Sequence, residues 1–350
     1  MAERARRGQV VALLANYCWV SLEQPGPADQ RRLLCTRRTR LAKGGQSICV
    51  GDWVQVEGID WSDERAAVAA VEPRQCSLER PPVANITRVV VVVALAEPAL
   101  DPMQLTRFLI TAEASGAAVD LVFSKADLLP EARVANWLQQ ATAWGYAPLA
   151  VCSTSGKGLA ALQQRLREPG LAVLCGPSGV GKSSLLNALI PQLDLRVAAV
   201  SGRLQRGRHT TRHVELFALA PGALLADTPG FNRPALPADA DALAACFPEL
   251  RQRLAQQPCQ FADCRHQGDP GCAMGAAWDR QMLFGQCLEA VLSEQRRRQQ
   301  TQRQAEAGSL RRRGDRLEPR LAAQYRQASR RGRRQQTAAE FNRQDPEDSD

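Results

Sequence analysis

Hydrophobic residues along the chain recur in two patterns, and the first of them predicts strands. Up to Val71, short runs alternate between apolar and polar positions, with turn residues such as Pro25-Gly26-Pro27 between them; this is typical of half-buried strands. The expected strands are Val10–Leu14, Cys18–Leu22, Arg32–Thr36, Ile48–Val56 and Arg65–Val71. Five short strands in succession predict a small barrel of the OB or SH3-like kind. Such a barrel either binds oligonucleotides or serves only as a packing module.

From Arg88 onward, near-continuous apolar runs alternate with stretches of helical periodicity. The runs, each of buried-strand length, are Arg88–Leu95, Val119–Phe123, Leu149–Cys152, Leu171–Cys175 and Ala223–Ala226. The expected helices are Met103–Ala114, Glu131–Ala143, Leu159–Arg167 and Lys182–Leu189. This alternation predicts a doubly wound, mostly parallel sheet, in which ligands bind at the carboxyl ends of the strands.

A proline-rich boundary and changes in composition divide the chain into four predicted parts. Arg80-Pro81-Pro82 marks the first boundary, since such dipeptides interrupt regular structure. We predict a multidomain protein with an OB-type barrel over residues 1–78 and an α/β domain over 79–234. A mainly helical block rich in Cys and His follows over 235–294. The last part, 295–350, is an Arg-rich tail, helical or disordered.

The net charge of +9 is concentrated in that tail. Between Gln295 and Arg334 there are 14 Arg and three acidic residues, a net charge of +11, so the remainder is nearly neutral. The tail is therefore either an arm that binds a polyanion such as RNA, or a solvated extension that maintains solubility. The composition alone leaves both readings open.

Two further observations favour a cytoplasmic protein without a membrane span. The longest apolar run, Val89–Ala96, has only the length of a buried strand, and no apolar signal segment follows Met1. The 11 cysteines are sparse in a chain of 350 residues, which favours reduced thiols over a disulfide framework. We expect a monomer.

The strongest motif is a phosphate-binding loop between a predicted strand and a predicted helix. Its residues are Gly176, Pro177, Ser178, Gly179, Val180, Gly181, Lys182, Ser183 and Ser184. Backbone N–H groups and the start of the helix would surround phosphate oxygens. Lys182 would contact the β- and γ-phosphates and act in catalysis, and Ser183 would bind Mg²⁺ through its hydroxyl.

A second turn, Asp227-Thr228-Pro229-Gly230, ends another buried strand. An acid at this place suits a contact to Mg²⁺, and the N–H of Gly230 could bind the γ-phosphate. In the segment between the two motifs, Thr210 and Thr211 are candidates to close on Mg²⁺ and the γ-phosphate. His209 is the nearest candidate for a catalytic group, although a loop imidazole bonded to backbone explains it equally well.

A base-reading element precedes the phosphate loop. Ser124-Lys125-Ala126-Asp127 follows a predicted strand and resembles the Asn-Lys-x-Asp motif of GTPases. The Asp127 carboxylate could accept both the N1–H and the N2 amino group of guanine, and the alkyl stem of Lys125 could cover the base. Ser153, in the loop after the next strand, would belong to the accompanying base loop. Both elements lie before the phosphate loop, so the sheet is predicted to be circularly permuted.

Four soft ligands fall within fourteen residues of the third part: Cys259, Cys264, His266 and Cys272. A Cys3His set is typical of a structural zinc site, which leaves no open position for catalysis. A chance cluster of reduced thiols is the alternative. The other eight cysteines lie mostly in apolar strands or helices and are expected to be core residues.

Together these motifs, in this order from about Gly8 to Cys287, resemble the RsgA (YjeQ) family of circularly permuted GTPases. Further marks of the resemblance are Arg80-Pro-Pro-Val-Ala-Asn85 and Arg206-Gly-Arg-His-Thr-Thr211. It implies an OB domain, a permuted GTPase and a zinc-bearing domain. It also implies GTP hydrolysis stimulated by the small ribosomal subunit, release after hydrolysis, and contact with ribosomal RNA. The family's proposed catalytic histidine falls on His209, and Ser124 stands where the family usually has Asn or Thr.

Two other functions remain open from the sequence. The chain could be a nucleotide-gated RNA-binding module whose hydrolysis is incidental, or a permuted GTPase acting on another assembly such as the large ribosomal subunit. The barrel before the GTPase and the Cys/His cluster after it argue against the second.

Overall fold

The fold comes from a computed structural model, which describes residues 5–37, 47–79, 82–190, 215–227, 234–313 and 316–319. Its contacts divide the chain into two compact units, Met1–Val291 and Leu292–Asp350. Each unit is described by itself.

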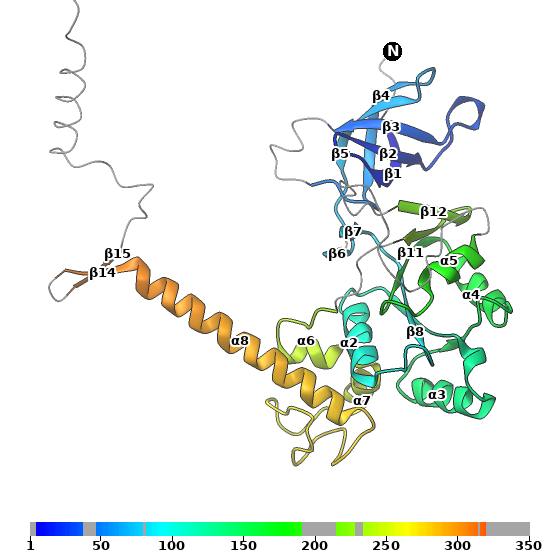
Figure 1. The fold of residues 1–350 in the computed structure, drawn as a ribbon. Coiled ribbons are helices and arrows are strands. Elements are labelled where there is room, and N and C mark those ends of the chain that lie inside the picture. Colours follow the sequence, from blue (N-terminus) through cyan, green and yellow to red (C-terminus); the bar gives the residue numbers. More distant parts are fainter. Residues whose placement is uncertain are drawn as a thin grey trace, which may run out of the picture. The chain divides into compact units, whose positions relative to one another are not determined.

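The first unit begins with a closed five-stranded barrel (Figure 1). Its strands are β1 (Arg6–Leu13), β2 (Tyr17–Leu22), β3 (Arg32–Arg37), β4 (Trp53–Asp60) and β5 (Arg65–Val71), and the turn Pro27–Asp29 forms a short 3-10 helix. The strand order is β1-β2-β3-β5-β4, and β4 pairs back onto β1 to close the barrel. Alternate residues such as Val10, Val20 and Val54 point inward and are fully buried, which is the alternation that the sequence pattern predicted.

Strand β4 begins later than predicted. The sequence favoured Ile48–Val56, whereas the strand starts at Trp53. Two features of the preceding residues explain the delay. The fully buried Asp52 accepts a hydrogen bond from the N–H of Cys49 at 2.7 Å, and the backbone of Gly51 has a φ of 88°. A positive φ is a turn conformation, so residues 49–52 form a turn ahead of the strand.

The second part of the first unit is a six-stranded α/β sheet. Its strands are β8 (Arg88–Ala94), β9 (Ala118–Ser124), β10 (Leu149–Ala150), β11 (Gly170–Cys175), β12 (Glu215–Ala220) and β13 (Ala223–Asp227). They lie in the order β10-β9-β8-β11-β13-β12. Neighbours are parallel from β10 to β13, and β12 runs antiparallel to β13.

Helices cover both faces of this sheet. They are α2 (Pro102–Glu113), α3 (Glu131–Ala143), α4 (Leu159–Leu166) and α5 (Lys182–Leu189). The run Val89–Val93 of β8 supplies both cores: Val89, Val91 and Val93 pack with α2 and α3, and Val90 and Val92 pack with α4 and α5. A strand with buried neighbours on both faces reads as a continuous apolar run. The predicted doubly wound sheet is therefore confirmed.

Strand β12 was not among the predicted elements, and it joins the two sheets. It pairs with β13 on one side and with β1 of the barrel on the other, so eleven strands form one continuous sheet. A separate two-stranded ribbon, β6 (Ser77–Glu79) and β7 (Pro82–Ala84), lies in the connection between the barrel and β8.

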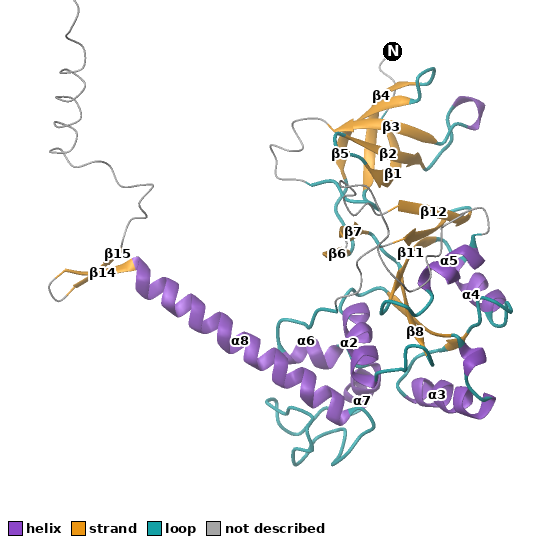
Figure 2. Cartoon of the chain, viewed as in Figure 1, coloured by secondary structure: helices purple, strands orange, loops and turns teal. Residues whose placement is uncertain are grey.

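The third part contains helices and a long loop (Figure 2). Its helices are α6 (Ala240–Ala245), α7 (Pro248–Gln256) and the start of α8 (Gln281–Ser309). The loop between α7 and α8 holds the Cys/His cluster. This block packs against α2 and α3: Arg251 pairs with Glu113 at 3.0 Å, and Asp279 accepts a hydrogen bond from Trp144 Nε1 at 2.5 Å.

Arg280 is the centre of that contact and is only 1% exposed. Its guanidinium donates to both carboxylate oxygens of Glu249, at 2.6 and 2.5 Å. It also lies over the rings of Phe247 and Trp144, at 4.5 and 4.8 Å from their centroids. Buried arginine is tolerated only with such partners, so this cage holds the third part on the α/β domain.

The second unit begins within α8. Between Leu292 and Gln302 that helix has mostly exposed polar residues, with Glu294 pairing to Arg297 and Arg298. After Ser309, strands β14 (Leu310–Arg313) and β15 (Arg316–Pro319) form an antiparallel hairpin. The predicted tail is thus helical at its start, and the hairpin is a feature that composition did not predict. Among the described residues, no helix combines the length and apolarity needed to cross a membrane.

We expect Arg280→Ala to lower the free energy of unfolding by about 3 kcal/mol, because it leaves the largely buried Glu249 carboxylate, 14% exposed, without its partner. Urea denaturation followed by tryptophan fluorescence measures this. Arg297→Ala is the matched control, since that side chain is 76% exposed and its ion pair contributes at most about 1 kcal/mol. Equal denaturation midpoints for the two variants would contradict the assignment.

Candidate functional site

The candidate nucleotide site lies at the carboxyl edge of the α/β sheet. Strands β9, β10, β11 and β13 are parallel, so the segments that follow them leave the sheet at the same edge. Ser124 and Asp227 end β9 and β13, and Ser153 and Gly176 lie in the segments that follow β10 and β11. The fold therefore brings together motifs that are up to a hundred residues apart in the sequence.

The phosphate loop follows β11 and is shaped by two glycines. Gly176 has a φ of 142°, and a Cβ there would lie 2.0 Å from the carbonyl oxygen of Val92, which only glycine avoids. Gly181, with a φ of 89°, forms the cap before α5. Lys182 opens that helix, and its Nζ donates to the carbonyl oxygens of Gly176 and Pro177 at 2.8 and 2.5 Å. The ammonium group thus lies inside the loop.

The remaining loop residues divide by exposure. Ser178, Gly179 and Ser183 are exposed, Ser184 is half-buried, and Val180 is buried at 1% exposure. The hydroxyl of Ser183 lies in the first turn of α5, where backbone N–H groups are without helical partners. Val180 therefore anchors the loop in the core, while Ser178, Gly179 and Ser183 are accessible to solvent.

Ser124 links the base-reading element to the phosphate loop. Its side chain is 3% exposed, and its hydroxyl lies 2.6 Å from the carbonyl oxygen of Val180 and 3.2 Å from that of Val93. A hydroxyl has a single proton, and the shorter distance assigns it to Val180. One hydrogen bond therefore joins the two motifs that the chain order separates.

Lys125 and Asp127 follow in an unusual backbone turn. Lys125 has a φ of 53°, and its Nζ donates to the carbonyl oxygen of Glu97 in the loop after β8. The short 3-10 helix Ala126–Leu128 then presents Asp127 at the surface. A left-handed backbone conformation is energetically unfavourable for a lysine. The hydrogen bond from Lys125 to Glu97 helps to hold the residue in it.

The base loop after β10 is held by its own backbone. The N–H of Val151 donates to Phe123 at 2.8 Å, and the N–H of Gly156 donates to Cys152 at 3.0 Å. The thiol of Cys152 lies 3.0 Å from the Thr154 hydroxyl, and hydrogen bonds from Ser155 and Thr154 lower its pKa. Ser153, half-buried, lies at the head of this turn.

Four predicted residues lie outside the part of the chain that the structure describes: His209, Thr210, Thr211 and Gly230. Asp227 ends β13 and is paired across the strands with Glu215. Because β13 is the parallel neighbour of β11, Asp227 at the end of β13 and the phosphate loop after β11 lie at the ends of adjacent strands.

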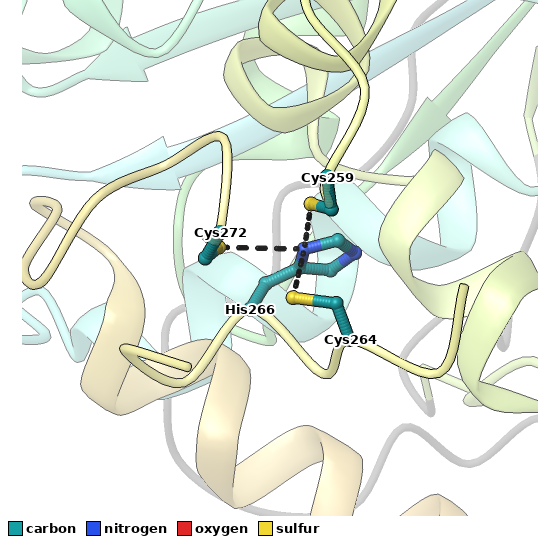
Figure 3. Close-up of side chains that lie close together, drawn as sticks. All are labelled: Cys259, Cys264, His266 and Cys272. Carbon is teal, nitrogen blue, oxygen red and sulfur yellow. Dashed lines mark hydrogen bonds between the residues drawn. The ribbon is translucent and has the colours of Figure 1, made fainter. Parts of the chain in front are cut away.

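The Cys/His cluster is brought together as predicted (Figure 3). Nδ1 of His266 lies 3.5, 3.7 and 3.8 Å from the Sγ atoms of Cys259, Cys264 and Cys272. A tetrahedral ion with ordinary Zn–S and Zn–N bond lengths would put sulfur and nitrogen about 3.6 Å apart. All four ligand atoms lie within 4.8 Å of one another, so this set could hold a metal ion.

Burial has opposite effects on two of these groups. It raises the pKa of the Cys264 thiol to about 12 and lowers the pKa of the His266 imidazole. A neutral imidazole is the form that binds metal, whereas the thiol must lose its proton on binding. Loading of the site therefore releases protons and is favoured by rising pH.

Asp269, which shapes this loop, is a residue that the sequence pattern did not predict. The carboxylate of Asp269 accepts hydrogen bonds from the N–H groups of Arg265 and Gln267, at 3.1 and 3.4 Å. On the other side, Trp278 Nε1 donates to the carbonyl oxygen of His266 at 3.1 Å. An acid three residues after the histidine was the available signal, since such a carboxylate can organise a tight loop.

Comparison with known proteins places these features in one family. A family model described as RsgA GTPase matches residues 71–237. The Small ribosomal subunit biogenesis GTPase RsgA of Synechococcus sp. (strain CC9311) is 56% identical over 288 residues, which cover 82% of this chain and 95% of the relative. The protein of the same name from Thermosynechococcus vestitus is 46% identical over 332 residues, 94% of each chain.

Two solved structures have the same arrangement. The crystal structure of YjeQ from Thermotoga maritima matches with a TM-score of 0.68 and 26% identity, covering 82% of this chain and 99% of that one. The structure of YloQ, a circularly permuted GTPase, matches with a TM-score of 0.68 and 25% identity, covering 83% and 96%. The predicted permuted order of the sheet is thereby confirmed.

We expect Ser124→Ala to weaken GDP binding about 5- to 10-fold, because the loss of one buried hydrogen bond, about 1 kcal/mol, loosens the base motif from the phosphate loop. Isothermal titration with GDP and Mg²⁺ measures this. The control is Ser115→Ala, which removes a hydroxyl bonded to Ala112 at the end of α2. Affinity unchanged within a factor of two would contradict the role given to Ser124.

We expect Cys264→Ser to abolish metal binding and unfold the loop between α7 and α8, since metal affinity at such a site is folding energy. GDP binding should persist, because the phosphate loop is built on other elements. Metal content by atomic absorption and loop protection by proteolysis measure the outcome. Cys246→Ser, a change at a buried cysteine of the same block, is the control and should retain the metal. A full metal equivalent in Cys264→Ser would refute the ligand set.

Proposed function

This chain belongs to the RsgA GTPase family, and from that premise we propose that it hydrolyses GTP while bound to the small ribosomal subunit during late maturation. That it is a GTPase of ribosome biogenesis follows from its family. The proposal adds that the subunit stimulates hydrolysis and that hydrolysis is coupled to release. It further adds ribosomal RNA as the contacted surface and a cytoplasmic monomer as the acting form.

One observation carries the assignment of the nucleotide site: the hydrogen bond between Ser124 and the carbonyl of Val180 at 2.6 Å. It connects a guanine-type motif to a phosphate loop although the chain order separates them. A phosphate loop alone would serve ATP and GTP equally, whereas the Asp127 carboxylate at the head of the base site can accept two hydrogen bonds from guanine and none of that pattern from adenine.

The phosphate groups would be held by the loop from Gly176 to Ser184. Its exposed backbone N–H groups would donate to phosphate oxygens. The Lys182 ammonium, now bonded to two carbonyl oxygens of the loop, would be within reach of the β- and γ-phosphates. The carbonyl bonds keep the side chain folded over the loop, so little entropy is lost when phosphate replaces them.

Mg²⁺ would be held by Ser183 and Asp227. The serine is exposed in the first turn of α5, and the acid ends the strand next to β11, which suits oxygen ligands from neighbouring segments. When bound, the ion supplies charge neutralisation for the β- and γ-phosphates. Thr210 and Thr211 would close on the same region. His209 would position or activate water, since Phe231, after Gly230, cannot do so by hydrogen bonding.

The Cys/His cluster would hold one structural zinc ion through Cys259, Cys264, His266 and Cys272. The donor set of three sulfurs and one nitrogen at near-tetrahedral separations supports zinc over harder ions. When bound, the ion would keep the loop between α7 and α8 closed.

The barrel surface supports an RNA partner. Arg32 lies over Trp19 at 4.7 Å and Arg6 over Trp61 at 5.0 Å. Arg7 lies over Trp53 at 4.0 Å, but its charge is compensated by ion pairs with Glu23 and Glu72. Arginine beside an aromatic ring combines a charge for phosphate with a flat surface for a base. These pairs give the barrel chemistry suited to unpaired RNA.

The test is hydrolysis of GTP and ATP by one preparation, each with and without purified small ribosomal subunits. We expect stimulation of GTP hydrolysis only. Asp127→Asn should lose GTP turnover by at least about 100-fold, corresponding to two charge-assisted hydrogen bonds at ~1.5 kcal/mol each. It should regain turnover with xanthosine triphosphate, whose 2-oxo group accepts from the new amide. The exposed Asp63→Asn is the control. Equal hydrolysis of ATP, or no response to the subunit, would refute the proposal.

A further inference from the structure

The second unit begins with a basic arm, residues 292–319. The arm consists of the part of α8 after Val291 and the hairpin formed by β14 and β15. It contains eight arginines and four acidic residues, a net charge of +4. Composition left two readings open, an arm that binds a polyanion and a solvated extension. The places of the arginines in the helix and in the hairpin favour the first.

On α8, three successive arginines are open to solvent. Arg297 is 76% exposed and Arg298 is 65% exposed, and both pair with the same acid, Glu294. Arg296 is also exposed and has no acidic partner among the described residues. One carboxylate cannot compensate three guanidinium charges, so this turn of the helix keeps a net positive charge. Exposed ion pairs are weak, which leaves these arginines available to a more highly charged anion.

In the hairpin, the strand register sets two arginines opposite each other. Arg313 of β14 is the Cα partner of Arg316 of β15, whereas Arg311 is the partner of Glu318. Opposite charges across two strands stabilise a ribbon and like charges destabilise it. Asp315, in the turn, supplies at most one compensating charge for the two arginines beside it. This end of the ribbon is therefore positively charged, and an anion bound there would offset the repulsion.

The hairpin also lacks support from a larger sheet. Among the described residues, β14 and β15 pair only with each other and form a two-stranded sheet of their own. A two-stranded hairpin is at best marginally stable in water. A polyanion that neutralises its arginines would therefore stabilise the hairpin as well as bind it.

The other side chains of the arm narrow the class of partner. Between Gln295 and Ser309 the only apolar side chains are those of Ala305 and Ala307. That part of the helix therefore has no apolar face with which to enter a lipid surface or a protein groove. The arm contains no Trp, Tyr or Phe, so it lacks the aromatic surfaces on which unpaired bases stack. What remains is arginine, whose planar guanidinium binds phosphate through two parallel hydrogen bonds.

We propose that the basic arm binds the phosphate backbone of double-helical RNA. The helix offers the three arginines that begin at Arg296, and the ribbon offers Arg313 and Arg316. Contacts of this kind do not depend on base sequence, and the release of counterions makes them strongly salt-dependent. The arm thus complements the barrel, whose arginine–tryptophan pairs suit unpaired RNA. The inference rests on the proposed function for RNA as the partner, and it adds a second form of RNA and the residues that contact it.

Binding of the full chain to a blunt-ended RNA duplex of about 20 base pairs tests the arm, with fluorescence anisotropy at about 50 to 200 mM salt. We expect Arg313→Gln with Arg316→Gln to weaken binding roughly 10-fold at the higher salt. The slope of log affinity against log salt should fall by roughly 1.8, about 0.9 for each of two phosphate contacts. GDP affinity should equal that of the wild type, because the nucleotide site is built from the first unit.

The matched control is Arg133→Gln with Arg167→Gln. Both arginines are exposed on the α/β domain, so the control removes the same charge and should keep the wild-type slope. Arg296→Gln with Arg303→Gln tests the helix, on which these residues lie two turns apart. This second arm variant should lower the slope by a similar amount.

A slope that both arm variants leave unchanged would overturn the proposal and assign the arm to solubility. An equal fall in the control would also overturn it, because the effect would then follow from net charge alone. So would tighter binding of the wild type to vesicles containing an anionic phospholipid than to the duplex at the same salt. The assay uses neither GTP nor ribosomal subunits. A lack of subunit-stimulated hydrolysis would therefore refute the proposed function, while duplex binding would still decide the role of the arm.

Discussion

The two halves of the nucleotide site are joined by the hydrogen bond between the Ser124 hydroxyl and the carbonyl of Val180. The phosphate loop is fixed by its glycines and by the start of α5, and the base loop by its own backbone. Strands β9, β8 and β11 set the spacing of the two motifs, and among the described residues the Ser124 bond joins them directly. It lies at 3% exposure, where an unmet partner would cost about 1–3 kcal/mol.

Among the described residues, the third part of the first unit contacts the α/β domain on its base-reading side. Its contacts reach α2 and α3, through Glu113 and Trp144, and these helices cover the face of the sheet that β8 and β9 share. The Arg280 cage makes this attachment all-or-none, because a buried guanidinium is favourable only with all its partners in place. The barrel, in contrast, meets the phosphate side through β12. The barrel also contacts the connection into β8, through Ala84 and Asn85.

The features of the fold that depend on local sequence patterns could be predicted, and those that depend on distant residues could not. The valine run of β8, the loop from Gly176 to Ser184 and the Cys/His spacing are local patterns, and each was placed correctly. Strand β12 was missed because its pairing with β1 depends on residues two hundred positions away. The Arg280 cage and the Asp52 turn that delays β4 depend likewise on side chains brought together only by the fold. Contacts between residues far apart in the chain produce no hydrophobic periodicity in the sequence from which they could be predicted.

The strand order has a consequence for how the chain is made. Strands β8, β9 and β10 form one contiguous half of the sheet, and β11, β13 and β12 form the other. During synthesis the barrel therefore emerges first, then the base half, and the phosphate half last. The base half can pair its strands before the loop that binds phosphate has left the ribosome, and β1 must wait for β12, which is synthesised some two hundred residues later. The pairing of β1 with β12 can therefore form only after the start of the phosphate half has been synthesised.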